Sequence, residues 1–218
     1  MDVGEVPEPP WSLAGEAVVA LAWRTPLATA LPAGVRRLPG PVVVIAERWT
    51  ESSVGPYLAL AVGEPARAGT RVGISFSTVV VSSTDARVAE VTFWGRPGEC
   101  GTLGWHADAD GVEVAWEERR VSLRGRVGRR RLPLAVPAAV LQGRAGTPVV
   151  VPARWRGQAA RARWEIEVPT DDPLGALAGR RAGFHVAGAR LALGRATAPA
   201  PLFARWRAPA SEVEPGLP

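Results

Sequence analysis

Few side chains in this chain of 218 residues could form a covalent bond with a substrate. All 26 Lys and Arg residues are arginines, so no lysine is present. A lysine amine is needed to form a Schiff base with a carbonyl compound or to hold a phosphate in a P-loop. Cys100 is the single cysteine, and the sequence around it offers neither an adjacent histidine nor a helix N-terminus to activate a thiol. The sequence therefore excludes imine formation on a side chain and gives weak support to a thiol nucleophile.

Histidine and carboxylates come together in sequence only around His106. Asp108 and Asp110 follow it within four residues, and Asp110-Gly111 is typical of a hairpin turn. Alternate residues of a strand and its turn need not converge on one ion, and His185 is distant in sequence. We therefore expect no metal site and no cofactor.

The strongest charge pattern lies between Arg119 and Arg131, where seven of thirteen residues are arginine. The alternation there predicts a hairpin with one charged face, which could contact phosphates. No aromatic residue for base stacking lies inside the run, and Glu113, Glu117 and Glu118 precede it. A solvated strand face is the favoured interpretation. An anion-binding or nucleic-acid-binding surface is the alternative.

The composition favours one globular domain over residues 1–218. Hydrophobic residues make up 47% and charged residues 22%, and the 45 Gly and Pro residues indicate many turns. No apolar run approaches the roughly 18 residues of a membrane span, and the N-terminus lacks the basic region of a signal peptide. We therefore expect a cytoplasmic protein without a membrane partner, with loose tails at residues 1–10 and 208–218.

Strand patterns dominate the sequence. Seven β-branched or alternating runs are separated by Gly and Pro clusters, which predicts a barrel or a sandwich. One helix is predicted over residues 85–94 because Ser83, Thr84 and Asp85 can cap it and Gly95 and Pro97 follow it. A shorter helix is predicted over residues 172–179. The predicted strands cover residues 16–24, 41–49, 71–83, 111–116, 120–127, 147–153 and 161–168.

Five short motifs stand in a fixed order along about residues 9–195. They are Pro9-Pro10-Trp11-Ser12-Leu13-Ala14-Gly15, Ser53-Val54-Gly55-Pro56-Tyr57, Val81-Ser82-Ser83, Trp94-Gly95-Arg96-Pro97 and Gly183-Phe184-His185-Val186-Ala187-Gly188. In their order and spacing these motifs resemble the acetoacetate decarboxylase-like superfamily. The resemblance implies a cone-like, mainly antiparallel β-barrel with a few flanking helices, which agrees with the strand count.

The functional positions of that family are altered in this chain. A Pro-Lys pair after the helix supplies the family's Schiff-base amine, and here Gly98 follows Pro97. Ala59 and Val44 stand where the family has carboxylates, and a first-strand arginine aligns near Glu16. The chain thus resembles a divergent member that lacks the Schiff-base lysine, and we expect it not to decarboxylate acetoacetate through an imine.

The resemblance also places the candidate site. Glu99 would lie in an apolar pocket and act as a general acid or base, with Glu16 as its partner. Glu99 as a solvated loop residue paired with Arg96 is the alternative. The expected pocket is more apolar than the family's, unless side chains now fill it. The expected ligand-binding residues are Tyr57, Ala59, Trp94, Arg96 and Gly98.

Three functions stay open. The first is a small-molecule protein acting on a carbonyl compound, keto or polyketide-like, as a lysine-independent lyase, isomerase or cyclase. The second is a non-catalytic ligand-binding or degenerate member of the superfamily. The third is an anion or nucleic-acid binder that uses Arg119–Arg131, with nucleic acid the less favoured partner. We also expect a homo-oligomer.

Overall fold

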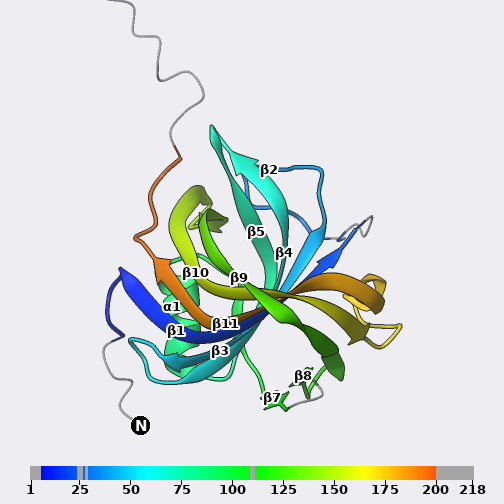
Figure 1. Cartoon of the computed structure of the whole chain (residues 1–218). Coiled ribbons are helices and arrows are strands. Elements are labelled where there is room, and N and C mark those ends of the chain that lie inside the picture. Colours follow the sequence, from blue (N-terminus) through cyan, green and yellow to red (C-terminus); the bar gives the residue numbers. More distant parts are fainter. Residues whose placement is uncertain (1–5, 24–26, 28, 109–110, 200–218) are drawn as a thin grey trace, which may run out of the picture.

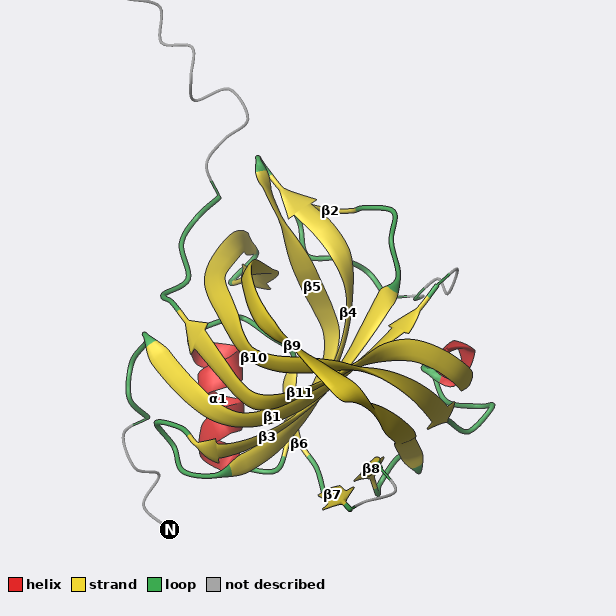
Figure 2. Cartoon of the chain, in the orientation of Figure 1, coloured by secondary structure: helices red, strands yellow, loops and turns green. Residues whose placement is uncertain are grey.

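The computed structural model describes residues 6–23, 27, 29–108 and 111–199. Strands account for most of this part of the chain, as Figure 1 and Figure 2 show. The elements are β1 (Trp11–Ala22), β2 (Val35–Arg37), β3 (Val42–Glu51), β4 (Tyr57–Ala68), β5 (Arg71–Val81), α1 (Thr84–Thr92), β6 (Gly98–Cys100), β7 (Leu103–Ala107), β8 (Val112–Trp116), β9 (Val121–Arg144), β10 (Thr147–Glu167), the 3-10 turn η1 (Gly175–Leu177) and β11 (Gly179–Leu193).

All the strands belong to one coiled sheet. Its order is β6-β5-β4-β3-β1-β11-β10-β9-β8-β7, with β2 paired to β4. Neighbours along this order are antiparallel, except that β6 runs parallel to β5. The sheet coils until β5 and β9 meet in a bridge between Ile74 and Val140, and Figure 1 shows the long β9 and β10 sweeping across the molecule. The predicted mainly β, cone-like architecture is confirmed.

The two faces of the sheet carry separate apolar clusters. Successive residues of a strand point to opposite faces, and on β1 Val18 joins one cluster while Ala17 joins the other. On β4, Leu60 and Ala61 divide in the same way. We call these the Trp164 cluster, which lies against β7 and β8, and the Trp94 cluster, which includes the buried face of α1.

The helix α1 confirms the predicted helix and ends two residues earlier than expected. The Ser83 hydroxyl accepts a hydrogen bond from the Ala86 N–H at 3.4 Å, and Asp85 lies in the first turn, near the positive end of the helix dipole. Ala86, Ala89 and Glu90 form its buried face. The cap thus fixes the first residue of the helix. Glu90 is a charged residue on the buried face of the helix.

Two predicted elements are wrong. Residues 172–179 form only the short turn η1, because Asp172 accepts hydrogen bonds from the Leu174 N–H and from Arg119, and Gly175 and Gly179 disfavour a helix. The run Arg119–Arg131 is not a hairpin by itself. The hairpin turn lies before Val121, and the arginines continue into β9.

The N-terminal segment contacts the sheet rather than lying loose from residue 6 onward. The Trp11 indole donates to the Pro7 carbonyl at 2.8 Å, and Arg195 donates to the Pro9 carbonyl at 2.9 Å. Pro9 itself is buried. The predicted tail at residues 208–218 lies outside the described residues.

The middle of β9 forms a sheet edge. Between residues 126 and 139, β9 pairs with β10 on one side, and no strand of the described chain pairs with its other side. This edge exposes Leu132 and Val136, and Pro133 and Pro137 interrupt it.

Candidate functional site

Four of the predicted ligand-binding residues lie together, but in the core. Tyr57, Ala59 and Trp94 belong to the Trp94 cluster, and Arg96 is buried beside them. Gly98 lies next to α1, where a Cβ on it would stand 3.0 Å from the Glu90 Cβ. None of these residues lines either of the two cavities described below. These side chains pack against one another in the core, and their role in ligand binding stays a prediction.

The positions aligned with the family's two carboxylates lie on opposite faces of the sheet. Val44 packs in the Trp164 cluster, whereas Ala59 packs in the Trp94 cluster. The two residues therefore do not share a site. The residue directly across from Ala59 is Glu47 on β3, which keeps a carboxylate on the Trp94 side.

A charged cluster replaces the expected apolar cavity. The Arg96 guanidinium lies 3.0 Å from the Glu90 carboxylate, and both side chains are at least 93% buried. The Arg96 guanidinium also stacks over the Phe76 ring, 4.6 Å from its centroid. Burial raises the pKa of Glu90, although the Arg96 charge opposes the rise. This pair fixes α1 to the loop that follows it.

Glu47 adds a second carboxylate to the Arg96 charge. Burial raises the pKa of Glu47 to about 7, and the charge of Glu90 adds to the rise while Arg96 opposes it. The Trp49 indole N–H donates to the Glu47 carboxylate at 3.1 Å. Burial, followed by the charges of Glu90 and Glu47, also raises the pKa of Tyr57. One arginine thus serves two buried carboxylates, so Glu47 holds a proton near neutral pH.

Trp94 contacts another tryptophan rather than a cavity. Its ring meets Trp11 edge-on at 5.0 Å between centroids, and its indole N–H donates to the Gly194 carbonyl at 3.3 Å. These contacts join the loop after α1 to the first and last strands. They use both the face and the polar atom of the ring.

Glu99 does not lie in an apolar pocket as expected. Its side chain is exposed, because β6 lies at the edge of the sheet. Arg96 pairs with Glu90 and not with Glu99, so the alternative ion pair is absent from the described contacts as well.

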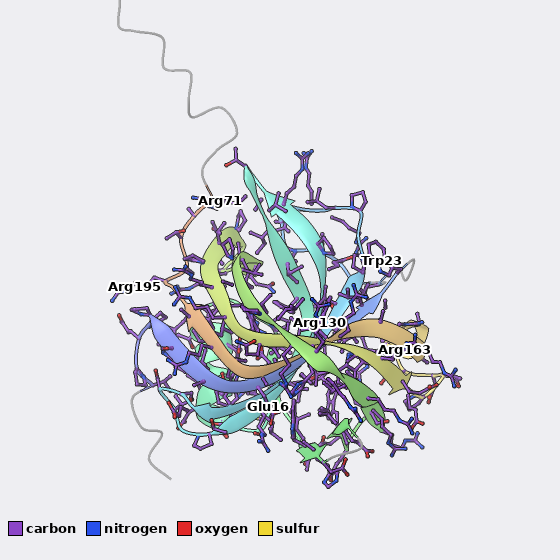
Figure 3. All side chains as sticks on the ribbon, viewed as in Figure 1. Glu16, Trp23, Arg71, Arg130, Arg163 and Arg195 are labelled. Carbon is purple, nitrogen blue, oxygen red and sulfur yellow. The ribbon has the colours of Figure 1, made fainter. Side chains whose placement is uncertain are left out.

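Glu16 has different partners from the one expected. Its carboxylate lies 2.7 Å from the Arg48 guanidinium and 3.1 Å from Nε2 of His185. The hydrogen bond from His185 lowers the pKa of Glu16, and the charges of Arg48 and Arg131 lower it further against the opposing effect of burial. The carboxylate is therefore ionised at neutral pH. These residues come from β1, β3, β9 and β11, and Figure 3 labels Glu16 on β1.

His185 is buried with one ring nitrogen unused. It is 5% exposed, and its Nδ1 has no hydrogen-bond partner among the described residues. An ionised carboxylate at Nε2 favours the tautomer that carries its proton there. Nδ1 is enclosed by protein, whereas the Glu16 side chain is 17% exposed, so the carboxylate is the accessible base of the pair. A carboxylate–imidazole pair of this kind is a common general base in enzymes.

A cavity of about 590 Å³ lies beside this pair. Its volume lies within the range usual for small-molecule sites. Glu16 and His185 line it together with Val127, Arg129 and Arg131. The cavity therefore brings a carboxylate–imidazole pair, an apolar side chain and two positive charges to one place.

A second cavity of about 840 Å³ adjoins the first at the tip of the β7–β8 hairpin. Both cavities are lined by Asp108, Gly111 and Val112. The second cavity also contains a cross-strand row of side chains with mostly alternating charge, formed in register by His106, Glu113, Arg124, Glu165 and Arg180. Four of the seven arginines of the Arg119–Arg131 run thus line the two cavities, whereas the sequence placed the run on a solvated hairpin. They are Arg124, Arg126, Arg129 and Arg131.

His106 pairs with Asp108 at the surface. Its Nε2 lies 3.0 Å from the Asp108 carboxylate, and the His106 side chain is 73% exposed. No group of three or more His, Cys, Asp or Glu residues in the described ranges could hold a metal ion. Cys100 is exposed.

Sequence reasoning missed Glu47, Glu90 and His185 as members of polar clusters. Each lies in an otherwise apolar element: Pro41–Trp49, the Ala86–Ala89 face of the helix, and Gly183–Leu193. The available signal for a polar cluster was a charged residue at a position that the apolar pattern of the element predicts to be buried. No helix in the described part of the chain is long and apolar enough to cross a membrane.

No family model and no curated protein matches the sequence, but solved structures do. Acetoacetate decarboxylase from Legionella pneumophila superposes with a TM-score of 0.64 at 14% identity, covering 89% of this chain and 88% of its own. The enduracididine biosynthesis enzyme MppR, with HEPES buffer bound, gives 0.63 at 15% identity, covering 90% of each chain. An acetoacetate decarboxylase-like enzyme from Sphingomonas wittichii RW1 gives 0.62 at 17% identity, covering 86% of this chain and 91% of its own. This chain therefore has the acetoacetate decarboxylase-like fold.

Proposed function

We propose that this chain is a divergent acetoacetate decarboxylase-like enzyme that acts on a small carbonyl compound by acid–base chemistry, without an imine. The observation that carries the proposal is the hydrogen bond between Glu16 and His185 on the wall of a cavity. The structural neighbours include enzymes, which supports catalysis on this fold. The absence of lysine removes the amine that an imine would need.

The proposed step is proton transfer from the carbon next to the carbonyl group. The Glu16 carboxylate accepts the proton, and the electron pair of the broken C–H bond moves toward the carbonyl oxygen to give an enolate. The Nε2–H of His185 holds that carboxylate in place. Arg129 or Arg131, on the same cavity wall, stabilises the enolate oxygen or a substrate carboxylate. Return of the proton to carbon completes an isomerisation, and the same enolate is the intermediate of a lyase or a cyclase.

Deuterium exchange tests this step without knowledge of the natural substrate. Each of a panel of keto acids and diketones is incubated with the protein in D2O, and NMR follows loss of the α-proton signal. We expect catalysed exchange with at least one compound. Glu16→Gln and His185→Gln should each slow it by about a hundredfold, the usual contribution of a general base.

Glu99→Gln is the matched control, because Glu99 is an exposed glutamate outside the cavity. It should exchange at the wild-type rate. Exchange that depends on Glu99, or that survives in the folded Glu16→Gln variant, would refute the assignment.

A ligand-binding protein without turnover is the second candidate. The packing of Ala59 and Trp94 in the core supports it, because neither residue lines the two cavities described above. A native mass spectrum that retains a small molecule, together with no exchange in any compound of the panel, would select this candidate over the first.

A further inference from the structure

The outer face of β9 and β10 places two arginines directly opposite each other. Arg126 pairs in register with Arg163, both side chains are exposed, and both line the 840 Å³ cavity. Opposed side chains of neighbouring strands lie roughly 5 Å apart at Cβ, where like charges are unfavourable. The backbone register therefore holds two positive charges close together at one point of the cavity wall.

The other arginines of this cavity have partners. Arg124 lies 2.8 Å from Glu113, and Arg180 lies 3.2 Å from Glu165. Arg181 donates to backbone carbonyls, among them that of Ala178 at 2.7 Å. By contrast, no ion pair found among the described residues includes Arg126 or Arg163. Among the described residues that line this cavity, five are arginines and three are carboxylates, which leaves an excess of two positive charges.

Other arginine pairs in the sheet show what is special about this one. Arg36 faces Arg67 and Arg156 faces Arg190 in the same kind of register. Neither of these pairs lines either cavity. A concave wall concentrates the field of its charges, whereas a flat exposed surface lets water and salt screen them. The pair Arg126–Arg163 thus combines uncompensated charge with a concave surface.

We propose that Arg126 and Arg163 form a phosphate-binding subsite for a phosphorylated small molecule. A phosphate monoester carries close to two negative charges at neutral pH, which matches the excess charge of the cavity. Two guanidinium groups can each offer paired N–H donors to its oxygens. This subsite does not depend on turnover, because Glu16 and His185 line the other cavity.

Titration with phenyl phosphate tests the subsite. Binding is measured by calorimetry and by changes in the NMR signals of the arginine Nε–H groups. We expect saturable binding that Arg126→Gln with Arg163→Gln weakens by about tenfold or more, because the double variant removes both positive charges of the subsite. The double variant Arg156→Gln with Arg190→Gln removes the same charge elsewhere. It should bind within about twofold of wild type.

Three results would overturn the subsite. Equal weakening in the two double variants would show a general charge effect. Benzoate binding as tightly as phenyl phosphate would show a carboxylate site. If a single-stranded RNA 20-mer binds more tightly than phenyl phosphate, and both double variants weaken its binding equally, the arginines form a nucleic-acid surface instead. Phenyl phosphate binding should persist in His185→Gln, so failure of the proposed catalytic step leaves this test intact.

Discussion

Glu47 and Ala59 stand directly opposite each other on β3 and β4, facing the Trp94 side of the sheet. The family resemblance assigns a carboxylate to the position of Ala59, and in this chain the neighbouring strand carries one instead. That carboxylate is buried with Glu90 and Arg96 and does not line either cavity. The carboxylate opposite Ala59 thus belongs to a charged core cluster, away from the two cavities.

Glu47→Gln should flatten the dependence of stability on pH. Because burial raises the pKa of Glu47 from 4.5 to about 7, the folded state binds more protons than the unfolded state between these values. The free energy of unfolding therefore falls as pH rises from about 4.5 to 7, by about 3 kcal/mol from this group. Urea denaturation at several pH values measures it. An unchanged pH profile in Glu47→Gln would contradict the assignment.

Arg96→Met should lower the free energy of unfolding by about 3–5 kcal/mol, because it leaves buried carboxylates without their counter-charge. Arg124→Met is the control. It breaks an ion pair with Glu113, in which the Arg124 side chain is 69% exposed. It should therefore lower the free energy of unfolding by about 1 kcal/mol or less. Urea denaturation at pH 8 compares the two variants. Similar losses in both would show that burial of the Arg96 cluster has no special effect.

Trp94→Ala should destabilise the fold by about 3–5 kcal/mol through loss of its contact with Trp11. Because the ring lines neither cavity, Trp94→Phe should keep the ligand-binding properties of the wild type. Thermal denaturation measures the first effect, and titration with phenyl phosphate measures the second. Weaker ligand binding in a stable Trp94→Phe variant would support the expected role of Trp94 as a ligand-binding residue.

The protein should not form a side-chain imine with acetoacetate. Incubation with acetoacetate and borohydride, followed by peptide mass mapping, should find no reduced adduct on any side chain, because the sequence contains no lysine. Release of CO2 that borohydride plus acetoacetate abolishes would show that another amine performs this chemistry.

The sequence was sufficient to predict the fold class because β-branched runs, capping residues and turn residues all agree with it. Ser83 caps α1 as expected, and Val42–Glu51 is an apolar strand. It was insufficient for β4 and β11, whose glycine and alanine content weakens the local strand signal. The positions of β4 and β11 are set by pairing with strands that are distant in sequence. A local sequence pattern carries no information on such pairing.

The candidate site was predicted only in part. Glu16 was singled out, but its partner His185 lies 169 residues away along the chain and is brought to it by the pairing of β1 with β11. For Glu99, the alignment gave a position but not the exposure of its side chain. A shift of one residue along a strand exchanges the two faces of a sheet, so an alignment of short motifs does not decide which face Val44 or Ala59 occupies.

The proline pair on the open edge of β9 affects how copies of this chain meet. Pro133 and Pro137 lack the N–H that a continuing ladder requires. An incoming strand could therefore not form a regular set of hydrogen bonds along this apolar edge, even though Leu132 and Val136 are exposed there. The sequence of β9 thus protects the protein against edge-to-edge aggregation at the site where its sheet is left open.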